Sequence, residues 1–213
     1  SVCSEYLKQK YGKKATIIPN MVYIDEYNQK QKGNKNITVA YIGNFGYYQS
    51  CDGLINEIPR ILKNTDSTVH FTFIGGGNTL NNFIEKTKDM NNVIVKGWLN
   101  KKDIIISLST SSIGLLPMDD VSVNKARHPL KLLEYQASRM AVIAPKVGML
   151  KEYTNGENII FYNAGDFSSM ADKIIELCNN KKLREKITEN GYKFVKKYNV
   201  NTIMKKWIRF YEV

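Results

Sequence analysis

The stretch ITVAYIG, residues 37–43, is a short apolar run rich in β-branched residues that ends in a glycine, and it predicts a buried β-strand. A helix is predicted next, at 52–63, where leucine and isoleucine recur at helical spacing although Pro59 interrupts the run. The same strand–loop–helix unit then repeats along the chain. Further strands are predicted at 69–74, 92–96, 111–116, 141–144 and 158–162, alternating with helices at 79–88, 101–108, 129–138 and 148–153.

This alternation predicts an α/β fold, with a doubly wound parallel sheet covered by helices on both faces. Three C-terminal helices are predicted at 167–179, 181–197 and 200–212. The first 36 residues differ, since they predict a helix at 1–12, a short strand at 15–20, a polar loop at 30–36 and no core of their own. We interpret residues 1–36 as a connector from an upstream N-terminal domain and residues 37–213 as a ligand-binding domain.

The composition narrows the class of ligand. The chain has 213 residues and a net charge of +11, which favours nucleic acid, an anionic membrane surface or an anionic small ligand. Lysine and arginine are spread along the chain and no RNA-binding aromatic motif or zinc finger occurs, so no nucleic-acid partner is expected. The three cysteines and two histidines have no metal-ligand spacing, so we expect neither a zinc site nor a disulfide framework.

The location follows from two further features. No apolar run reaches membrane-spanning length, and the first residues have no signal-peptide core. We therefore expect a cytoplasmic protein, with contact at the inner face of the membrane left open.

The segment HPLKLLEYQAS, residues 128–138, is the strongest candidate for chemistry. Pro129 suits the first position of a helix, where free backbone amides and the helix dipole favour an anion. Lys131 in the first turn could contact a phosphate, and Glu134 could accept hydrogen bonds from a ribose diol. The alternative is an ordinary amphipathic helix, with Leu130, Leu133 and Ala137 facing the core and Lys131–Glu134 as a surface ion pair.

Glycines follow the first strands of the predicted sheet. GNFGYYQ at 43–49 is not a dinucleotide-binding fingerprint, but Gly43 and Gly46 would allow a ligand close to the backbone. Gly75–Gly77 follows the second strand, and Trp98 after the third could line a nucleobase pocket or belong to the core. Because ligands of open parallel sheets bind beyond the carboxyl ends of the strands, we expect the loops at 43–49, 75–77, 97–99 and 127–134 to converge.

Several segments resemble the C-terminal half of retaining GT-B glycosyltransferases of family 4 (group 1). PLKLLEYQASRMAVIAP at 129–145 resembles that family's P-K-L-x-E-Y-M-A-x-G-x-P-V-I-A signature. Residues 18–27 (IPNMVYIDEY) resemble the family's interdomain segment, and residues 41–49 (YIGNFGYYQ) resemble its glycine loop. Residues 147–162 resemble the segment that leads into its last strand, and residues 195–213 its closing helices. The chain departs from the family at Ala126, Asn44 and Arg139, which stand where a glutamate, a basic residue and a small residue are common.

The resemblance implies a domain that binds a UDP- or GDP-linked sugar for retaining hexosyl transfer in bacterial surface polysaccharide synthesis. The acceptor would lie on a missing N-terminal domain, and neither a metal nor a cofactor is implied. Lys131 would meet the diphosphate and Glu134 the ribose, as the catalytic residues. The substrate-binding residues would be Gly43, Asn44, Gly46, Gln49, Gly76, Trp98, Arg127, His128, Pro129 and Leu130. Two alternatives remain, a sugar-nucleotide epimerase of the same fold and a non-catalytic module that binds a nucleotide or a membrane surface.

Overall fold

The core of the fold is a six-stranded sheet in the order β3-β2-β1-β4-β5-β6, in which every neighbouring pair of strands is parallel. It is seen in a computed structural model that describes residues 2–27, 36–46, 51–66, 68–148, 150–151 and 157–212. The six predicted strands are confirmed, each within two residues at either end. Their bounds are β1 Ile37–Asn44, β2 Val69–Gly76, β3 Val93–Lys96, β4 Ile113–Leu115, β5 Ala141–Pro145 and β6 Ile160–Tyr162.

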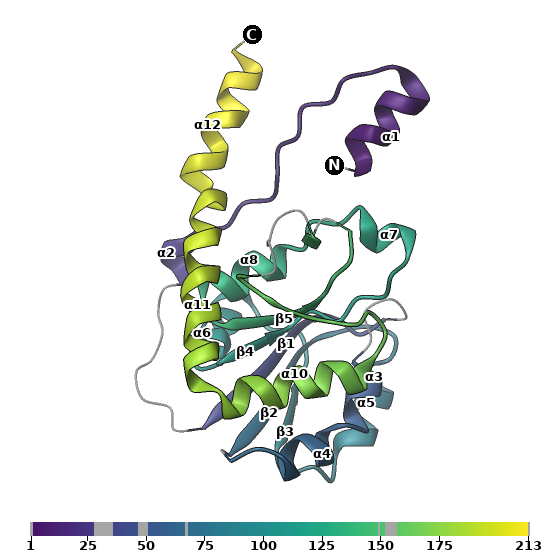
Figure 1. Cartoon of the computed structure of the whole chain (residues 1–213), viewed down its shortest axis with the longest axis vertical. Helices are drawn as coiled ribbons and strands as arrows, with labels where there is room; N and C mark the ends of the chain where they lie inside the picture. The colour runs from purple at the N-terminus through teal and green to yellow at the C-terminus, as the bar shows by residue number, and fades with distance from the viewer. Residues whose placement is uncertain are drawn as a thin grey trace.

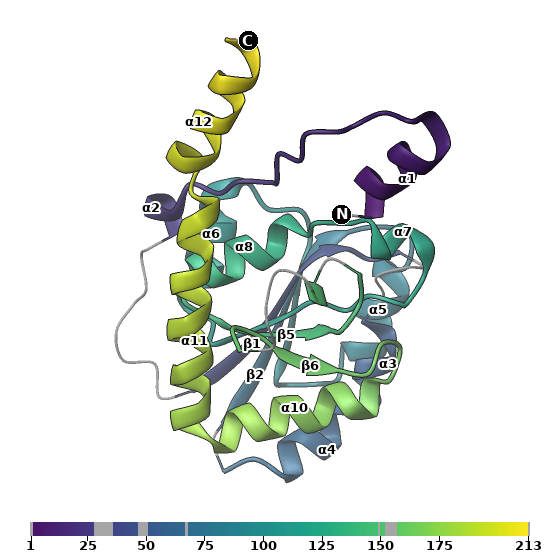
Figure 2. The same cartoon turned by 45° about the horizontal axis from the view of Figure 1, so that its top comes forward.

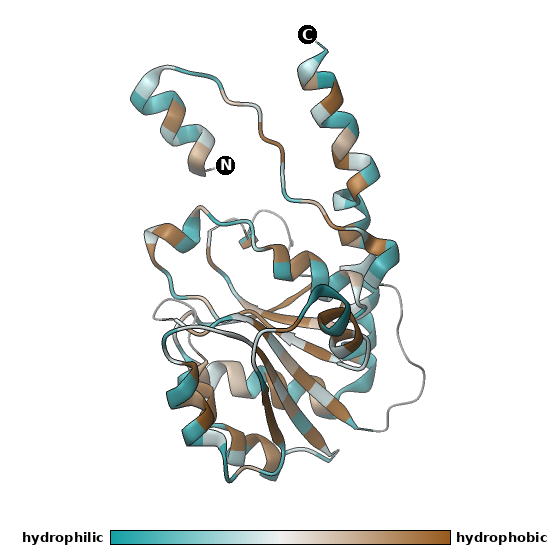
Figure 3. Ribbon diagram, turned by 180° about the vertical axis from the view of Figure 1, so that it is seen from behind, coloured by the Kyte–Doolittle hydropathy of each residue, from teal (hydrophilic) through white to brown (hydrophobic). Residues whose placement is uncertain are grey.

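Helices cover both faces of this sheet (Figure 1), as the predicted doubly wound arrangement requires. Side chains along β1 alternate, because Val39 and Tyr41 belong to one buried apolar cluster and Ala40 to the other. The first cluster is covered by α3 (Asp52–Ile55), α4 (Ile58–Lys63), α5 (Leu80–Thr87) and α10 (Phe167–Asn179). The second is covered by α2 (Ile24–Tyr27), α6 (Lys101–Ser109) and α8 (Leu130–Ala137), while α11 (Lys181–Val195) contributes to both. Figure 3 shows the resulting concentration of hydrophobic residues in the strands.

Four sequence predictions need correction or lie largely beyond the described residues. The helix predicted at 52–63 is two short helices, α3 and α4, because Pro59 fits the first turn of a helix and not its interior. The strand predicted at 15–20 is wrong: this segment has no regular secondary structure, and its neighbour Val22 forms an isolated bridge with Asn199 instead of joining the sheet. The loop predicted at 30–36 and the helix at 148–153 fall largely outside the described residues.

The two ends of the chain stand away from the sheet (Figure 2). Helix α1 (Val2–Tyr11) and the segment after it lead to α2. Val22, just before α2, and Ile24 and Tyr27 within it are buried in the second cluster. The 3₁₀ turn η1 (Lys196–Tyr198) follows α11, and α12 (Val200–Tyr211) projects beyond the domain. Across the described residues, no helix has both the length and the apolar content needed to cross a membrane.

Helix α8 ends in an unusual conformation at Arg139, whose φ of 55° lies in the left-handed region that glycine adopts without strain. The Arg139 guanidinium lies over the ring of Tyr192, 3.7 Å from its centroid. This stacking offsets part of the cost of a side chain at a position where a small residue is common in the resembling family.

The carboxyl ends of β1 and β2 pack backbone against backbone, which requires a glycine at residue 75. Its φ is 138°, and a Cβ atom there would overlap the carbonyl oxygen of Gly43. We expect Gly75→Ala to lower the free energy of unfolding by roughly 2–3 kcal/mol. Gly97→Ala is the matched control, since a Cβ there meets open space. Thermal denaturation of the two variants checks this, and equal melting temperatures would contradict it.

Candidate functional site

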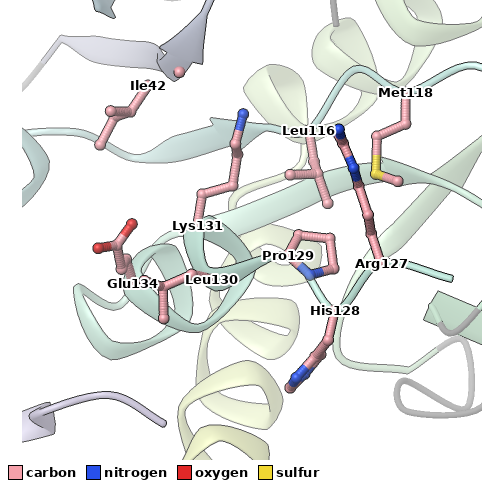
Figure 4. A pocket seen from close by; sticks show the side chains of 10 residues that line it. Ile42, Leu116, Met118, Arg127, His128, Pro129, Leu130, Lys131 and Glu134 are labelled. Atoms are coloured by element: carbon pink, nitrogen blue, oxygen red, sulfur yellow. The ribbon is translucent and has the colours of Figure 1, made fainter. Parts of the chain in front are cut away.

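A cavity of about 340 Å³ opens where the chain order of the sheet reverses, between β1 and β4. Its walls come from the end of β1, from the loop after β4 and from the start of α8 (Figure 4). This is the switch point at which open parallel sheets bind their ligands. The described residues that line it are Ile42, Gly43, Leu116, Met118, Arg127, His128, Pro129, Leu130, Lys131 and Glu134.

Tyr135 fixes helix α8 beside this cavity. Its hydroxyl accepts a hydrogen bond from the backbone N–H of Ile42 on β1, at 2.8 Å. Its ring fills the space beside Gly114 on β4, where a Cβ atom would lie 2.6 Å from a ring carbon. The first turns of α8 are thereby held against both strands of the switch point.

The helix begins one residue later than predicted, because Pro129 has an extended ψ of 117° and is the N-cap of α8. The N–H of Leu132 donates to the Pro129 carbonyl at 3.2 Å and closes the first turn. The core face of the helix is Leu132, Leu133, Tyr135, Gln136 and Ala137. Leu130, expected on that face if the helix were merely amphipathic, is instead 45% exposed and lines the cavity.

The Lys131 ammonium lies where the side chain of any other residue at position 43 would begin. A Cβ on Gly43 would overlap the Lys131 Nζ and come within 2.8 Å of the Tyr41 hydroxyl. The Nζ atom is also 4.7 Å from the centroid of the Tyr41 ring. The glycine at the end of β1 therefore makes room for the charge supplied by α8.

Burial, with a smaller contribution from the charge of the neighbouring Arg127, lowers the pKa of Lys131 to about 8, against opposing effects of Cys51 and Glu134. Lys131 is therefore charged below about pH 8 and increasingly neutral above it. If the ammonium binds an anion, affinity should fall as the pH rises through 8, and binding should take up protons there. Calorimetry with UDP from pH 6.5 to 9.5 in buffers of different ionisation enthalpy measures both effects. An affinity constant across this range would contradict the assignment.

Glu134 lies one turn beyond Lys131, and its Oε1 accepts a hydrogen bond from the Tyr27 hydroxyl at 2.9 Å. Burial raises the pKa of Glu134, whereas this hydrogen bond and the charges of Lys131 and Lys101 lower it. In Figure 4 the ends of Lys131 and Glu134 point in different directions along the cavity wall. The pair can thus contact two parts of one ligand.

Arg127 and His128 precede the helix and differ in direction. The Arg127 side chain extends towards the same side as Lys131, whereas the His128 imidazole points the other way (Figure 4). The His128 Nδ1 accepts from the Asn20 N–H at 3.2 Å, and its carbonyl accepts from the Asn20 side chain at 2.7 Å. Burial lowers the pKa of His128 to about 4, so its imidazole is neutral at physiological pH and supplies no charge to an anion.

The loops after β1, β2 and β3 are joined to one another. The N–H of Phe45 donates to the Gly76 carbonyl at 2.8 Å, and that of Gly75 to the Gly97 carbonyl at 3.2 Å. The indole of Trp98 lies over Gly76 but is 77% exposed. The structure thus brings the first three loops together and links the fourth to them through Lys131 and Gly43.

Some predicted residues lie beside the cavity and not in its wall. The Asn44 side chain lies near Gly46 and Gly77, and Gly76 and Trp98 lie on the β2–β3 side of β1. Gln49 lies outside the described residues. Conversely, Ile42, Leu116 and Met118 line the cavity but were not singled out from the sequence. Their only signal was their place at or just after the ends of the first and fourth predicted strands.

Further charged residues near the site have other partners. Lys125, two residues before Arg127, forms an ion pair with Asp120 at 3.3 Å. Within the described ranges of the chain, no three His, Cys, Asp or Glu side chains gather as a metal ion would require.

Comparison with solved structures supports the same architecture. The pneumococcal O-GlcNAc transferase GtfA, in complex with UDP and GlcNAc, superposes with a TM-score of 0.80 at 18% identity, over 99% of this chain and 42% of that one. A variant of Staphylococcus aureus TarM, in complex with fondaparinux, alpha-GlcNAc-glycerol and UDP, gives 0.78 at 20% identity, over 98% and 42%. The C-terminal domain of LpcC from Francisella tularensis, a group 1 glycosyl transferase, gives 0.67 at 21% identity, over 84% and 99%. These likenesses show the Rossmann-like domain of the GT-B fold.

Sequence comparison gives the family. The capsular polysaccharide biosynthesis glycosyltransferase CapM of Staphylococcus aureus is 27% identical over 168 residues, which are 76% of this chain and 42% of CapM. The chain thus spans less than half the length of this relative. The family model for glycosyl transferases group 1 matches residues 24–194, and the chain therefore belongs to that family.

Proposed function

We propose that this domain binds the nucleotide diphosphate sugar in a retaining hexosyltransferase. The observation that carries the proposal is the cavity at the β1–β4 switch point, where a half-buried lysine, an arginine and the start of a helix meet beside a glycine. Together they form a site for a diphosphate, because a helix start and two cations favour an anion. We assign the ribose of that ligand to Glu134, which lies one turn along the same helix.

The proposed chemistry is mainly electrostatic. As the bond from the sugar to the diphosphate breaks, negative charge gathers on the leaving diphosphate. Lys131, Arg127 and the first turn of α8 stabilise that charge, and the buried setting strengthens each contact. Gly43 allows the phosphates to approach the backbone at the end of β1, and retention of configuration follows from the family resemblance.

An upstream domain is the proposed source of the acceptor site. Helix α12 exposes apolar side chains, among them Met204, Ile208 and Phe210. A groove of about 500 Å³ runs along it, lined by Met21, Met204, Trp207, Ile208, Tyr211 and Glu212. An apolar groove of this kind fits a surface that another domain covers. The similarity to CapM, a capsular polysaccharide biosynthesis glycosyltransferase, supports a role in bacterial surface polysaccharide synthesis, which would place the enzyme in the cytoplasm at the inner face of the membrane.

A thermal-shift screen with UDP, GDP, ADP and CMP tests the proposal. The GtfA and TarM complexes with UDP favour that nucleotide. A ligand at about 100 times its dissociation constant should stabilise the domain by roughly 2.7 kcal/mol, a readily measured rise in melting temperature. No shift with any nucleoside diphosphate at millimolar concentration would overturn the proposal.

A further inference from the structure

The connector that leads into the domain contacts the helix that carries the proposed ligand site. Tyr27 is the last residue of α2, and its side chain is buried, with 4% of its surface exposed. Its hydroxyl is 2.9 Å from Glu134 Oε1 on α8, although the two residues are 107 positions apart in the sequence. Glu134 thus has a hydrogen-bond donor from outside its own helix.

The connector is held in place independently of this bond. Its Asn20 is hydrogen-bonded to the backbone of His128 at the start of α8. Val22 exchanges backbone hydrogen bonds with Tyr198 and Val200, at 2.9 and 3.1 Å. Glu26, next to Tyr27, pairs with Lys101 of α6. These contacts fix the position from which the Tyr27 hydroxyl reaches Glu134.

We propose that Tyr27 is a positioning residue, which orients the Glu134 carboxylate towards the ribose of the nucleotide. The inference rests on the proposed function, because it takes Glu134 as the ribose ligand. A glutamate side chain is flexible, and a hydrogen bond to one oxygen fixes the direction of the other. A carboxylate accepts about four hydrogen bonds, so one from Tyr27 leaves room for both hydroxyls of a ribose.

The environment keeps Tyr27 a donor. Burial raises the pKa of its phenol, and the negative charge of Glu134 raises it further. The hydroxyl therefore stays protonated and can only donate to a carboxylate. The groups that face Glu134 besides Tyr27 are Lys131 and Lys101, and neither replaces a bond aimed at Oε1.

Tyr27→Phe removes only the hydroxyl and tests the proposal by calorimetry. The ligands are UDP and 2′,3′-dideoxyuridine diphosphate, which lacks both hydroxyls that Glu134 would bind. We expect the variant to bind UDP roughly tenfold more weakly than the wild type. Its affinity for the dideoxy nucleotide should be nearly unchanged, because that ligand does not use Glu134.

Two controls separate positioning from a structural effect. Tyr23→Phe removes a phenolic hydroxyl from the same connector, at a side chain that is 52% exposed and whose ring lies under Lys101. It should leave both affinities unchanged. In a Glu134→Ala background, Tyr27→Phe should add little further loss, because no side chain is left at position 134 for Tyr27 to orient. Thermal denaturation confirms that each variant is folded.

The outcomes are distinguishable. If the wild type binds UDP better than the dideoxy form and Tyr27→Phe changes neither affinity, the positioning role is overturned and the proposed function stands. Equal losses for both ligands would show a general structural effect and overturn it as well. If the wild type binds both ligands equally, Glu134 is not the ribose ligand and the inference fails. If the wild type binds no nucleotide, the proposed function itself fails.

Discussion

This chain by itself is expected to form no glycosidic product from a UDP- or GDP-sugar and an acceptor. It spans 42% of the length of CapM, and its cavity supplies one wall of what we propose is a two-domain cleft. Transfer requires donor and acceptor to be held together in a closed site from which water is excluded. Slow hydrolysis of the donor is the most activity that we expect from the donor-binding side of the cleft alone.

An assay of the purified 213-residue chain with labelled UDP- and GDP-sugars, using lipid-linked and oligosaccharide acceptors, measures this directly. The prediction is that no glycosidic product is detected and that any consumption of the donor is slow hydrolysis. Repeated turnover by this chain alone would contradict the proposed division of donor and acceptor sites between two domains.

Lys131→Met is expected to weaken nucleotide diphosphate binding by about tenfold to a hundredfold. A hydrogen bond to a charged group contributes roughly 1.5–3 kcal/mol, and about 1.4 kcal/mol corresponds to tenfold in affinity. The loss should not come with unfolding, because burial of the ammonium already disfavours its charged form and methionine is an unbranched side chain only one atom shorter than lysine. Calorimetry with UDP measures the affinity, and thermal denaturation measures the stability.

Lys173→Met is the matched control, because Lys173 lies on α10, which covers the other face of the sheet, and pairs with Glu176. This change should leave the affinity for UDP unaltered. Equal affinities of the wild type, Lys131→Met and Lys173→Met for UDP would show that Lys131 on α8 does not bind the nucleotide and that the helix only packs against the sheet.

The sheet could be predicted from the sequence because its strands are short apolar runs closed by glycine or a polar loop. The order of the strands could not, since nothing local in residues 37–44 or 113–115 says that β1 and β4 are neighbours. The strand expected at 15–20 failed for a related reason. An apolar run becomes a strand only where a partner edge is available, and these residues instead lead to contacts with α8 and η1.

The candidate site was predicted in part. The pattern at 128–138 indicated a helix start beside an anion, and the structure places Lys131 and Glu134 in one cavity wall. The direction of His128 could not be predicted, because its partners Asn20 and Tyr198 are distant in the sequence. The bond from Tyr27 to Glu134 had no sequence signal, since it depends on how the connector crosses α8.

A crystal structure of this chain with UDP tests the central claim most directly. The account predicts that the diphosphate lies at the start of α8, with an oxygen within about 3 Å of Lys131 Nζ, and that the ribose hydroxyls contact Glu134. Gly43 should face the phosphates across the cavity. A nucleotide bound elsewhere, or bound in this cavity with its diphosphate away from Lys131 and the start of α8, would contradict the account.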